Sequence, residues 1–182
     1  MLQHDFIIQK LESQFPGYIS DVDTPYGMTT FTVPAEINLK VLQYLYHDEE
    51  LGFRFLTDIQ AIHFPDTKGK EICVVYHLHN LQKNVRVRMK SYLPIEKPDI
   101  FTATSLFSGA NWMERETYDF FGVNFLGHPN LKRVLNVDEM TYFPMRKEFP
   151  LEDQTRIDKD DEMFGRTVKN QPLTNASDAA LN

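Results

Sequence analysis

The segment 85–93 constrains the fold of this chain more than any other feature of its sequence. Every second side chain in it is apolar or small, and those between are basic or aromatic. The first set is Val85, Val87, Met89, Ser91 and Leu93, and the second is Arg86, Arg88, Lys90 and Tyr92. Successive side chains of a strand point to opposite faces of a sheet. The alternation therefore predicts a strand with one buried face and one solvent-facing face.

Two further strands are predicted directly before this segment. Residues 53–64 are rich in aromatic and β-branched side chains, and a second strand follows at 71–79, after a turn at Pro65. Residues 81–84 provide the hairpin connection to the strand at 85–93. Residues 53–93 are therefore predicted to form a three-stranded antiparallel meander with one buried and one wet face.

Apolar spacing of three and four residues predicts helices on either side of the meander. One is expected at 5–15, and a second after Asn38, which has the side chain of an N-cap. Between these helices, residues 28–33 end at Pro34 and suit an edge strand or a strand end. A long helix is expected from about 100 to 122. Its core-facing stripe would be Ala103, Leu106, Phe107, Ala110, Met113, Thr117 and Phe121.

After Gly122 the periodicity is lost, and isolated apolar residues stand between basic ones. The predicted fold class is therefore α+β: a small antiparallel or mixed sheet with helices packed on one side, followed by an extended C-terminal arm. We expect an α+β domain over residues 1–123 and a partner-wrapping arm with a polar tail over residues 124–182.

Composition excludes several functional classes. The chain has 182 residues and a net charge of −7, so non-specific nucleic-acid binding is not expected. Cys73 is the only cysteine, which rules out a disulfide framework, a CxxC zinc or redox pair, and an iron–sulfur cluster held by this chain alone. The eight glycines form no GxGxxG or GxxxxGK[ST] pattern. The longest apolar run, 72–76, is far shorter than the roughly 20 residues that span a bilayer. With no secretory signal at its start, the chain is expected in the cytosol unless a partner holds it elsewhere.

Two features of the predicted sheet are candidate sites. Cys73, His77 and His79 share one face, but no fourth ligand lies at metal-binding spacing, so a solvated or docking face is expected instead of a zinc or copper site. Cys73 lies among apolar residues, which argues against a catalytic thiolate. The ridge of Arg86, Arg88 and Lys90 is interpreted as a wet strand face, with an acidic partner as the alternative.

The block from Trp112 to Gly122 carries the most informative charges. Helical geometry places Glu114 on the apolar stripe, where a carboxylate is costly without compensation. Arg115 would face Asp119 one turn later as a favourable pair. Cations follow at His128, Lys132, Arg133, Arg146 and Lys147. Three interpretations stay open: the arm folds back and locks onto the helix, helix and arm present these charges to a partner, or paired carboxylates act as acid and base.

The same block resembles the signature of a known family. The matching residues are Glu114-Arg115-Glu116, Asp119-Phe120-Phe121, His128, Lys132 and Val134-Leu135. A second block, Phe-Pro-Met-Arg-Lys-Glu-Phe-Pro-Leu at 143–151, is similar to the family's Pro-x-Arg-Lys-Asp-Phe-Pro-Leu segment, with Glu148 in place of Asp and without the usual preceding Gly. These blocks resemble the thirty-kilodalton subunit, also named the C subunit, of respiratory complex I, the proton-pumping NADH:quinone oxidoreductase. The resemblance spans about residues 30–152.

The resemblance implies a non-catalytic structural subunit of the hydrophilic arm of that complex, supporting electron transfer from NADH to quinone coupled to proton translocation. It implies no cofactor on this chain, with FMN and iron–sulfur clusters on partner subunits. The expected partners are foremost the large quinone-site subunit, named the D subunit, and also subunits B and I. The expected place is the cytoplasmic side of the cell inner membrane, reached only through the complex. Glu114, Arg115, Glu116, Asp119, His128, Lys132, Arg133, Arg146 and Lys147 are the predicted partner-interface residues.

Two alternatives stay open. One is the equivalent subunit of a ferredoxin-linked oxidoreductase or an energy-converting hydrogenase, which one chain cannot distinguish from complex I. The other belongs to a different class: a stand-alone binding module that acts through the basic strand face.

Overall fold

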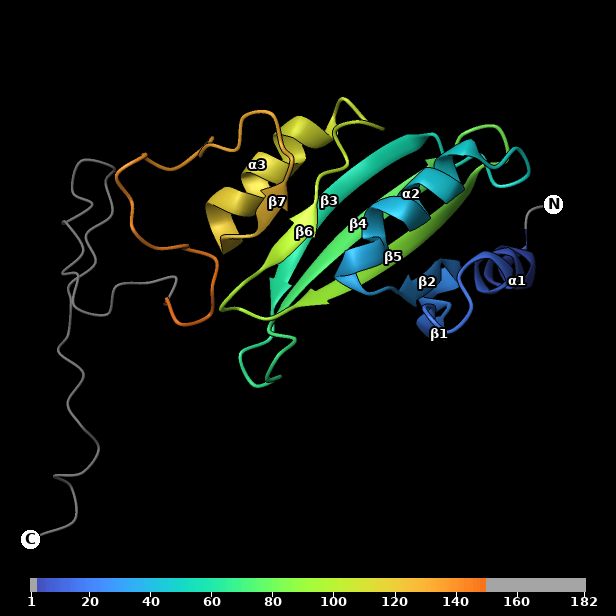
Figure 1. Cartoon of the computed structure of the whole chain (residues 1–182), viewed down its shortest axis with the longest axis horizontal. Helices are drawn as coiled ribbons and strands as arrows, with labels where there is room; N and C mark the ends of the chain where they lie inside the picture. Colours follow the sequence, from blue (N-terminus) through green and yellow to red (C-terminus); the bar gives the residue numbers. More distant parts are fainter. Residues whose placement is uncertain (1–2, 150–182) are drawn as a thin grey trace, which may run out of the picture. The chain divides into compact units, whose positions relative to one another are not determined.

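The computed structural model of the chain describes residues 3–149, shown in colour in Figure 1. Its α-helices are α1 (His4–Gln14), α2 (Asn38–His47) and α3 (Ala110–Phe121). Its strands are β1 (Ser20–Asp23), β2 (Thr29–Thr32), β3 (Phe55–His63), β4 (Ile72–Asn80), β5 (Val85–Leu93), β6 (Asp99–Phe101) and β7 (Asn124–Leu126). Single 3₁₀ turns occupy Pro25–Gly27 and Ala35–Ile37.

A five-stranded mixed sheet forms the centre of the fold, in the order β1-β2-β5-β4-β3. Strands β3, β4 and β5 are antiparallel neighbours, so the predicted meander is confirmed. The predicted wet face is wrong for the central strand, because eight of the nine residues of β4 are buried. Strand β2 runs parallel to β5 and places Phe31 beside Met89. A separate parallel pair joins β6 to β7, with Ile100 opposite Phe125.

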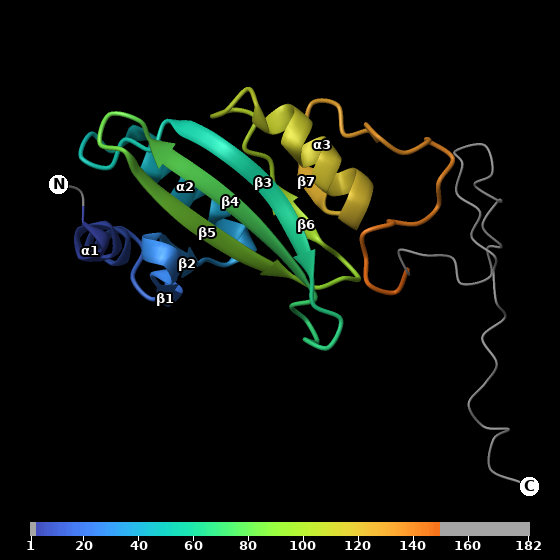
Figure 2. The same ribbon diagram turned by 180° about the vertical axis from the view of Figure 1, so that it is seen from behind.

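The helices pack on one face of this sheet. Figure 1 shows α2 lying across β4 and β5, and Figure 2, from behind, shows the same strands in front of the helix. Helix α2 buries Val41, Leu42 and Leu45 in a core shared with β5, whose Val87 and Met89 are fully buried. Each such side chain contributes about 1.5–3 kcal/mol on burial. The α+β class with helices on one side of a mixed sheet is confirmed.

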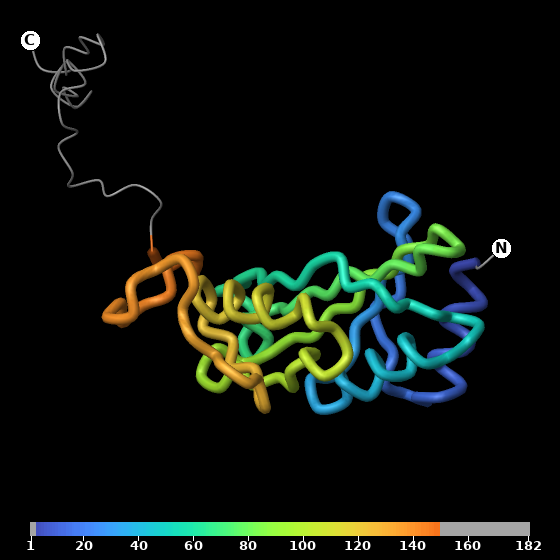
Figure 3. The backbone as a smooth tube through the Cα atoms, turned by 90° about the horizontal axis from the view of Figure 1, so that it is seen from above, coloured from blue at the N-terminus to red at the C-terminus, as the bar shows by residue number. Residues whose placement is uncertain are grey.

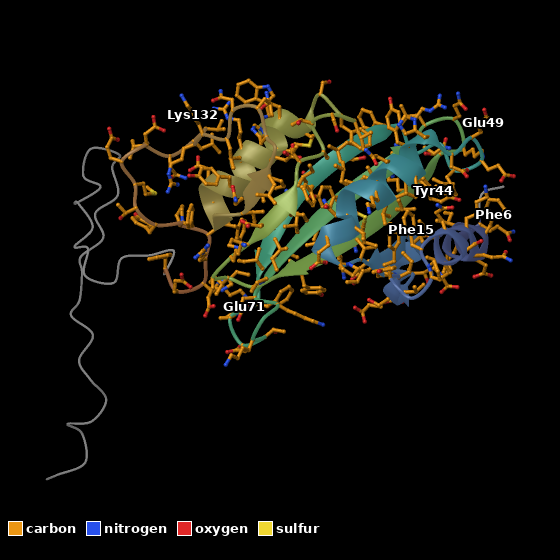
Figure 4. All side chains as sticks on the ribbon, in the orientation of Figure 1. Phe6, Phe15, Tyr44, Glu49, Glu71 and Lys132 are labelled. Carbon is orange, nitrogen blue, oxygen red and sulfur yellow. The ribbon has the colours of Figure 1, made fainter. Side chains whose placement is uncertain are left out.

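Helix α1 lies beside α2 and extends the same layer. Phe15 of α1 meets Tyr44 of α2 edge to face, with ring centroids 5.7 Å apart (Figure 4). Lys10 donates to Asp48 at 2.9 Å and also pairs with Glu50. The expected helix at 5–15 is therefore present within one residue.

The expected helix over 100–122 is wrong in its first half. Residues 99–101 form β6, turns follow to 109, and α3 begins only at Ala110. The turns bring Ala103 and Phe107 to the core because the N–H groups of Leu106 and Phe107 both bond the Ala103 carbonyl. Consecutive turns repeat at nearly the same spacing as a helix, so the apolar pattern alone did not separate them.

Three smaller expectations also need correction. Asn38 does not cap α2: the helix begins at this residue, whose buried amide donates instead to the Phe101 carbonyl at 3.2 Å. Strand β2 ends at Thr32, two residues before Pro34, so the strand end is confirmed, but β2 is an interior strand between β1 and β5 and not an edge strand. Strand β1 was not expected because all four of its residues are exposed and give no burial pattern.

The described part of the predicted C-terminal arm, residues 124–149, is called the return segment here. The compact unit of the fold extends to Phe149 and so includes this segment. The polar tail, which contains the acidic sequence Asp-Lys-Asp-Asp-Glu at 158–162, lies outside the described residues. Within residues 3–149, none of the helices has the length and apolar character needed to span a bilayer.

Candidate functional site: helix α3 and the return segment

The return segment folds back along α3, as the orange and yellow tubes in Figure 3 show. The reversal starts at Gly122, which ends the helix in a left-handed conformation at φ +78°. A Cβ atom at this position would lie 2.5 Å from Cε2 of Phe143 and 2.7 Å from Nη2 of Arg146. Glycine therefore supplies both the backbone conformation and the space that the returning chain occupies.

The carboxylate of Asp119 is the centre of the contact between helix and return segment. It is fully buried, and its Oδ2 accepts the backbone N–H groups of Val134, Leu135 and Asn136 at 2.8–3.0 Å. Its Oδ1 accepts Nη1 of Arg133 at 2.7 Å and the Asn136 side-chain amide at 3.0 Å. These donors hold the pKa of the Asp119 carboxyl far below its usual range despite burial, which alone would raise it.

The side chain of Arg133 contacts α3, two backbone carbonyl groups of the return segment and the Phe143 ring. Besides Asp119, its guanidinium donates to the carbonyl groups of Met140 at 2.8 Å and Tyr142 at 2.9 Å. It also stacks on the Phe143 ring, 5.1 Å from its centroid. One side chain therefore fixes the course of the return segment over ten residues.

Arg146 fastens the far end of the return segment to the helix terminus. Its Nε donates to the Phe121 carbonyl at 2.8 Å, and its guanidinium lies 4.7 Å from the Phe143 centroid. Phe143 is thus contacted by two guanidinium groups. One residue later, the Lys147 N–H donates to Nδ1 of His63 at the end of β3.

Arg115 does not form the expected pair with Asp119. Its Nε donates to the Lys132 carbonyl at 3.1 Å and its Nη2 to the Arg133 carbonyl at 3.2 Å. The guanidinium also lies 4.8 Å from the Trp112 ring. The Asp119 carboxylate is instead bound by Arg133 and by the backbone of residues 134–136, which the helical spacing could not disclose.

Glu114 is fully buried, as its place on the apolar stripe predicts, but no Arg or Lys compensates it within the described residues. The Thr102 hydroxyl donates to Oε2 at 2.5 Å, and the Ala103 N–H donates to Oε1 at 2.6 Å. Burial raises the pKa of this carboxyl to about 7, against the lowering effect of these two donors. Glu114 therefore joins α3 to the chain that follows β6.

His128 packs against the same carboxyl, with Nε2 4.0 Å from Glu114 Oε2. The Asn130 N–H donates to Nδ1 at 3.0 Å, so Nδ1 accepts and Nε2 carries the proton that reaches the Asn111 carbonyl at 3.2 Å. Burial lowers the pKa of His128, which favours this neutral tautomer. His128 is thus a link between α3 and the return segment.

The structure divides the nine predicted residues into two groups. Glu114, Arg115, Asp119, His128, Arg133 and Arg146 bind other parts of this chain through their side chains. The side chains of Glu116, Lys132 and Lys147 are exposed and have no hydrogen bond or ion pair with the described residues. Figure 4 shows Lys132 on the outer side of the return segment. The intrachain lock is therefore present, and a partner role for all nine stays a prediction.

Residue-by-residue reasoning missed a set of exposed apolar side chains on α3 and the return segment. We call them the exposed apolar set: Trp112, Leu135, Val137, Tyr142 and Met145. For the four members on the return segment, the signal was the isolated apolar residues between basic ones after Gly122. Such residues are too few for a core of their own, and the lock leaves them at the surface.

Residues 3–149 place the polar groups of this site in contacts that bind the return segment to α3. They contain no cluster of three His, Cys, Asp or Glu side chains suited to a metal. Cys73 is buried, and burial raises the pKa of its thiol to about 11, which leaves little thiolate at neutral pH. The side chains of Asp119 and Arg133 are hydrogen-bonded to each other and to the return segment.

Known proteins match both the sequence and the fold. The family model of the respiratory-chain NADH dehydrogenase 30 kDa subunit matches residues 31–155. The C subunit of the NADH-quinone oxidoreductase of Citrifermentans bemidjiense is 37% identical over 158 residues, which cover 86% of this chain and 95% of that one. The solved trypsin-resistant fragment (1–134) of Nqo5 is 30% identical with a TM-score of 0.59, over 69% of this chain and 98% of that one.

A second solved structure shares the fold at lower identity. It is a chain of the membrane-bound sulfane sulfur reductase, an archaeal respiratory membrane complex, 24% identical with a TM-score of 0.70 over 86% of this chain and 95% of that chain. The signature residues of α3 and the return segment lie inside the region that the family model matches. This chain therefore belongs to the family of the 30 kDa subunit, or C subunit, of respiratory-chain NADH dehydrogenase.

Proposed function

We propose that the chain acts as a non-catalytic structural subunit in the hydrophilic arm of NADH:quinone oxidoreductase. Membership of the complex follows from the family. The structural role is supported by one observation: the charged signature residues hold the return segment onto α3, and the exposed apolar set is left facing outward. A segment fixed in place loses little conformational entropy when a partner docks on it.

The proposed partner of the exposed apolar set is the D subunit, with subunits B and I nearby. Trp112, Tyr142 and Met145 are of the residue types enriched at the centres of protein interfaces. Electrons would pass through FMN and iron–sulfur clusters on other subunits, and none of these groups is proposed for this chain. The chain would lie on the cytoplasmic side of the inner membrane and reach the membrane only through the complex.

Leu135→Ser tests the interface, because Leu135 is 64% exposed and its side chain is not needed for the lock, which uses its backbone N–H. We expect the amount of the D subunit that co-purifies with the tagged chain from solubilised membranes to fall at least fivefold. The matched control is Leu81→Ser, since Leu81 is 63% exposed in the turn between β4 and β5. It should leave co-purification unchanged.

Assembly and chemistry are separated by measuring both in the same membranes. We expect Leu135→Ser to reduce the abundance of assembled complex, while NADH:quinone turnover per assembled complex stays within twofold of the wild type. Normal abundance combined with a collapse of turnover would mean that this chain takes part in the reaction, and would refute the structural role.

A further inference from the structure

A second surface lies on the opposite side of the sheet from the helices. Figure 2 shows β3, β4 and β5 in front of α2, with no described element over them. The side chains on this face come from alternate positions, namely the ones that do not enter the core. We call it the open face and define it by Phe55, Asp58, Gln60, Ile62, Val75, His77, Arg86, Arg88, Lys90 and Tyr92.

Positive charge is concentrated on this face. Arg86, Arg88 and Lys90 follow one another at every second position of β5, which places them about 7 Å apart along the strand. Lys70 adds a fourth cation, with Nζ 5.9 Å from the centroid of the Tyr92 ring. Four cations gathered on one face of a chain with a net charge of −7 form a segregated patch.

These cations are only partly compensated. Nε of Arg88 donates to Nε2 of His77 at 2.8 Å, and Nδ1 of His77 lies 3.8 Å from Oδ2 of Asp58. Burial and Arg88 lower the pKa of His77, consistent with its role as a neutral acceptor. The side chains of Arg86 and Lys90 have no hydrogen bond or ion pair with any residue from 3 to 149. The contacts from Asp58 through His77 therefore orient Arg88. They leave the Nη1 and Nη2 nitrogens of Arg88 free to bind another group.

Apolar groups flank the cations on the neighbouring strands. Val75 of β4 is buried between Gln60 and Lys90, its partners on either side. Phe55 and Ile62 of the edge strand β3 are 46% and 42% exposed. An extended segment lying on this face would meet a line of cations beside apolar side chains. Alternating carboxylates and apolar residues complement such a surface.

We propose that the open face binds an acidic, extended segment of another protein subunit within the assembled complex. This inference rests on the proposed function, because it requires the chain to be part of that complex. Nucleic acid and anionic bilayers are the disfavoured occupants, since the overall charge of −7 repels both and only one strand supplies the cationic row. The open face would thus be a docking surface separate from α3.

The test uses the full chain in its native complex and two site-specific photo-cross-linking probes. Benzoylphenylalanine is placed at Gln60 on the open face, or at Leu135 in the exposed apolar set. We expect the Gln60 probe to cross-link to an Asp- and Glu-rich peptide of another subunit. The double variant Arg86→Glu/Lys90→Glu should lower this yield at least fivefold and leave the Leu135 cross-link within twofold of its original yield.

A charge-matched control separates the open face from general electrostatics. Lys40→Glu/Lys68→Glu changes the net charge by the same amount at two exposed residues, one on α2 and one in the turn after β3. It should leave both cross-links unchanged. Equal losses in the two double variants would overturn the proposal, because the effect would then come from net charge alone.

The identity of the cross-linked product decides the occupant. Cross-linking of the Gln60 probe to residues 150–182 of this chain, to lipid or to nucleic acid would overturn the proposal. The proposal would also be overturned if the Gln60 probe gave no product while the Leu135 probe cross-linked to another subunit. Failure of both probes to reach another subunit would overturn the proposed function together with this inference.

Discussion

At the scale of single residues, Asp119 shows how a buried charge can organise a surface. The carboxylate accepts three consecutive backbone N–H groups of 134–136 and is paired with Arg133. Its desolvation is therefore offset by donors that come entirely from the return segment. The sequence indicated that the charges on this helix needed partners, but their identity depended on how the chain reverses at Gly122.

We predict that Asp119→Asn destabilises the fold by about 3 kcal/mol, because it leaves the Arg133 guanidinium unpaired in a site where its side chain is 6% exposed. The loss should appear in urea unfolding. Trypsin should also cleave after Lys132 and Arg133 at least tenfold faster in the native state. Asp138→Asn, at an exposed residue without a described partner, is the control. Equal stability of the two variants would contradict the central role of Asp119.

Glu114 predicts an unusual pH dependence. The pKa of this carboxyl is about 7 in the folded state against an ordinary value of 4.5, so the folded chain holds the proton more tightly than the unfolded chain. The contribution of Glu114 to stability is therefore full below pH 4.5 and is lost as pH rises through 7. The size of the effect is about 3 kcal/mol, at about 1.4 kcal/mol for each pKa unit.

The measurement is the difference in the free energy of unfolding between the wild type and Glu114→Gln from about pH 4.5 to 8. The wild type should lose stability relative to the variant as pH rises, because glutamine does not titrate. The lowered pKa of His128 produces a slope of the opposite sign, but the histidine is present in both proteins and largely cancels in the difference. A flat difference would show that Glu114 is ionised throughout this range.

At the scale of elements, the turn at Gly122 connects the end of α3 to the return segment. Alternation and helical spacing correctly predicted the meander and the first helix, since these patterns reflect burial on one face. They overextended the third helix to 100 because the turns between β6 and α3 bury Ala103 and Phe107 at helix-like intervals. Pairing of β6 with β7 joins residues about 25 positions apart, which no local pattern reports.

We predict that Gly122→Ala costs about 3 kcal/mol and releases the end of the return segment. Left-handed backbone strain accounts for about 1 kcal/mol, and displacement of Phe143 and Arg146 accounts for the remainder. Gly17→Ala is the matched control: it has the same φ of +78°, but nothing lies within 4 Å of the added Cβ. Urea unfolding of both variants isolates the contact, and equal losses would show that backbone strain is the whole effect.

At the scale of the whole molecule, family and fold agree with the sequence-based hypothesis. The signature at 114–135 lies within residues 31–155, which the family model matches. The sequence argued against a metal site at Cys73, His77 and His79, and the absence of a metal there stays a prediction. His77 accepts a hydrogen bond from Arg88, and His79 lies 3.2 Å from the Asn84 amide oxygen.

We predict that the purified chain carries no stoichiometric iron and no flavin absorbance, and does not oxidise NADH. The physical reason is its lone buried cysteine and the lack of a glycine-rich phosphate loop in its sequence. Metal analysis, a visible spectrum and an NADH consumption assay on the isolated protein check this. Stoichiometric cofactor on the isolated chain would refute the structural assignment.

The sequence by itself determined the family, the α+β class and which side chains of β5 face the core. Each of these depends on residue types and on their spacing over short stretches of chain. Only the tertiary structure decided what the charged signature does. Helical geometry pairs residues within one turn, whereas Asp119 finds its partners 14 to 17 positions later and Arg146 reaches back 25 positions to Phe121. Such contacts depend on where the chain reverses, and their desolvation is offset only in the folded state.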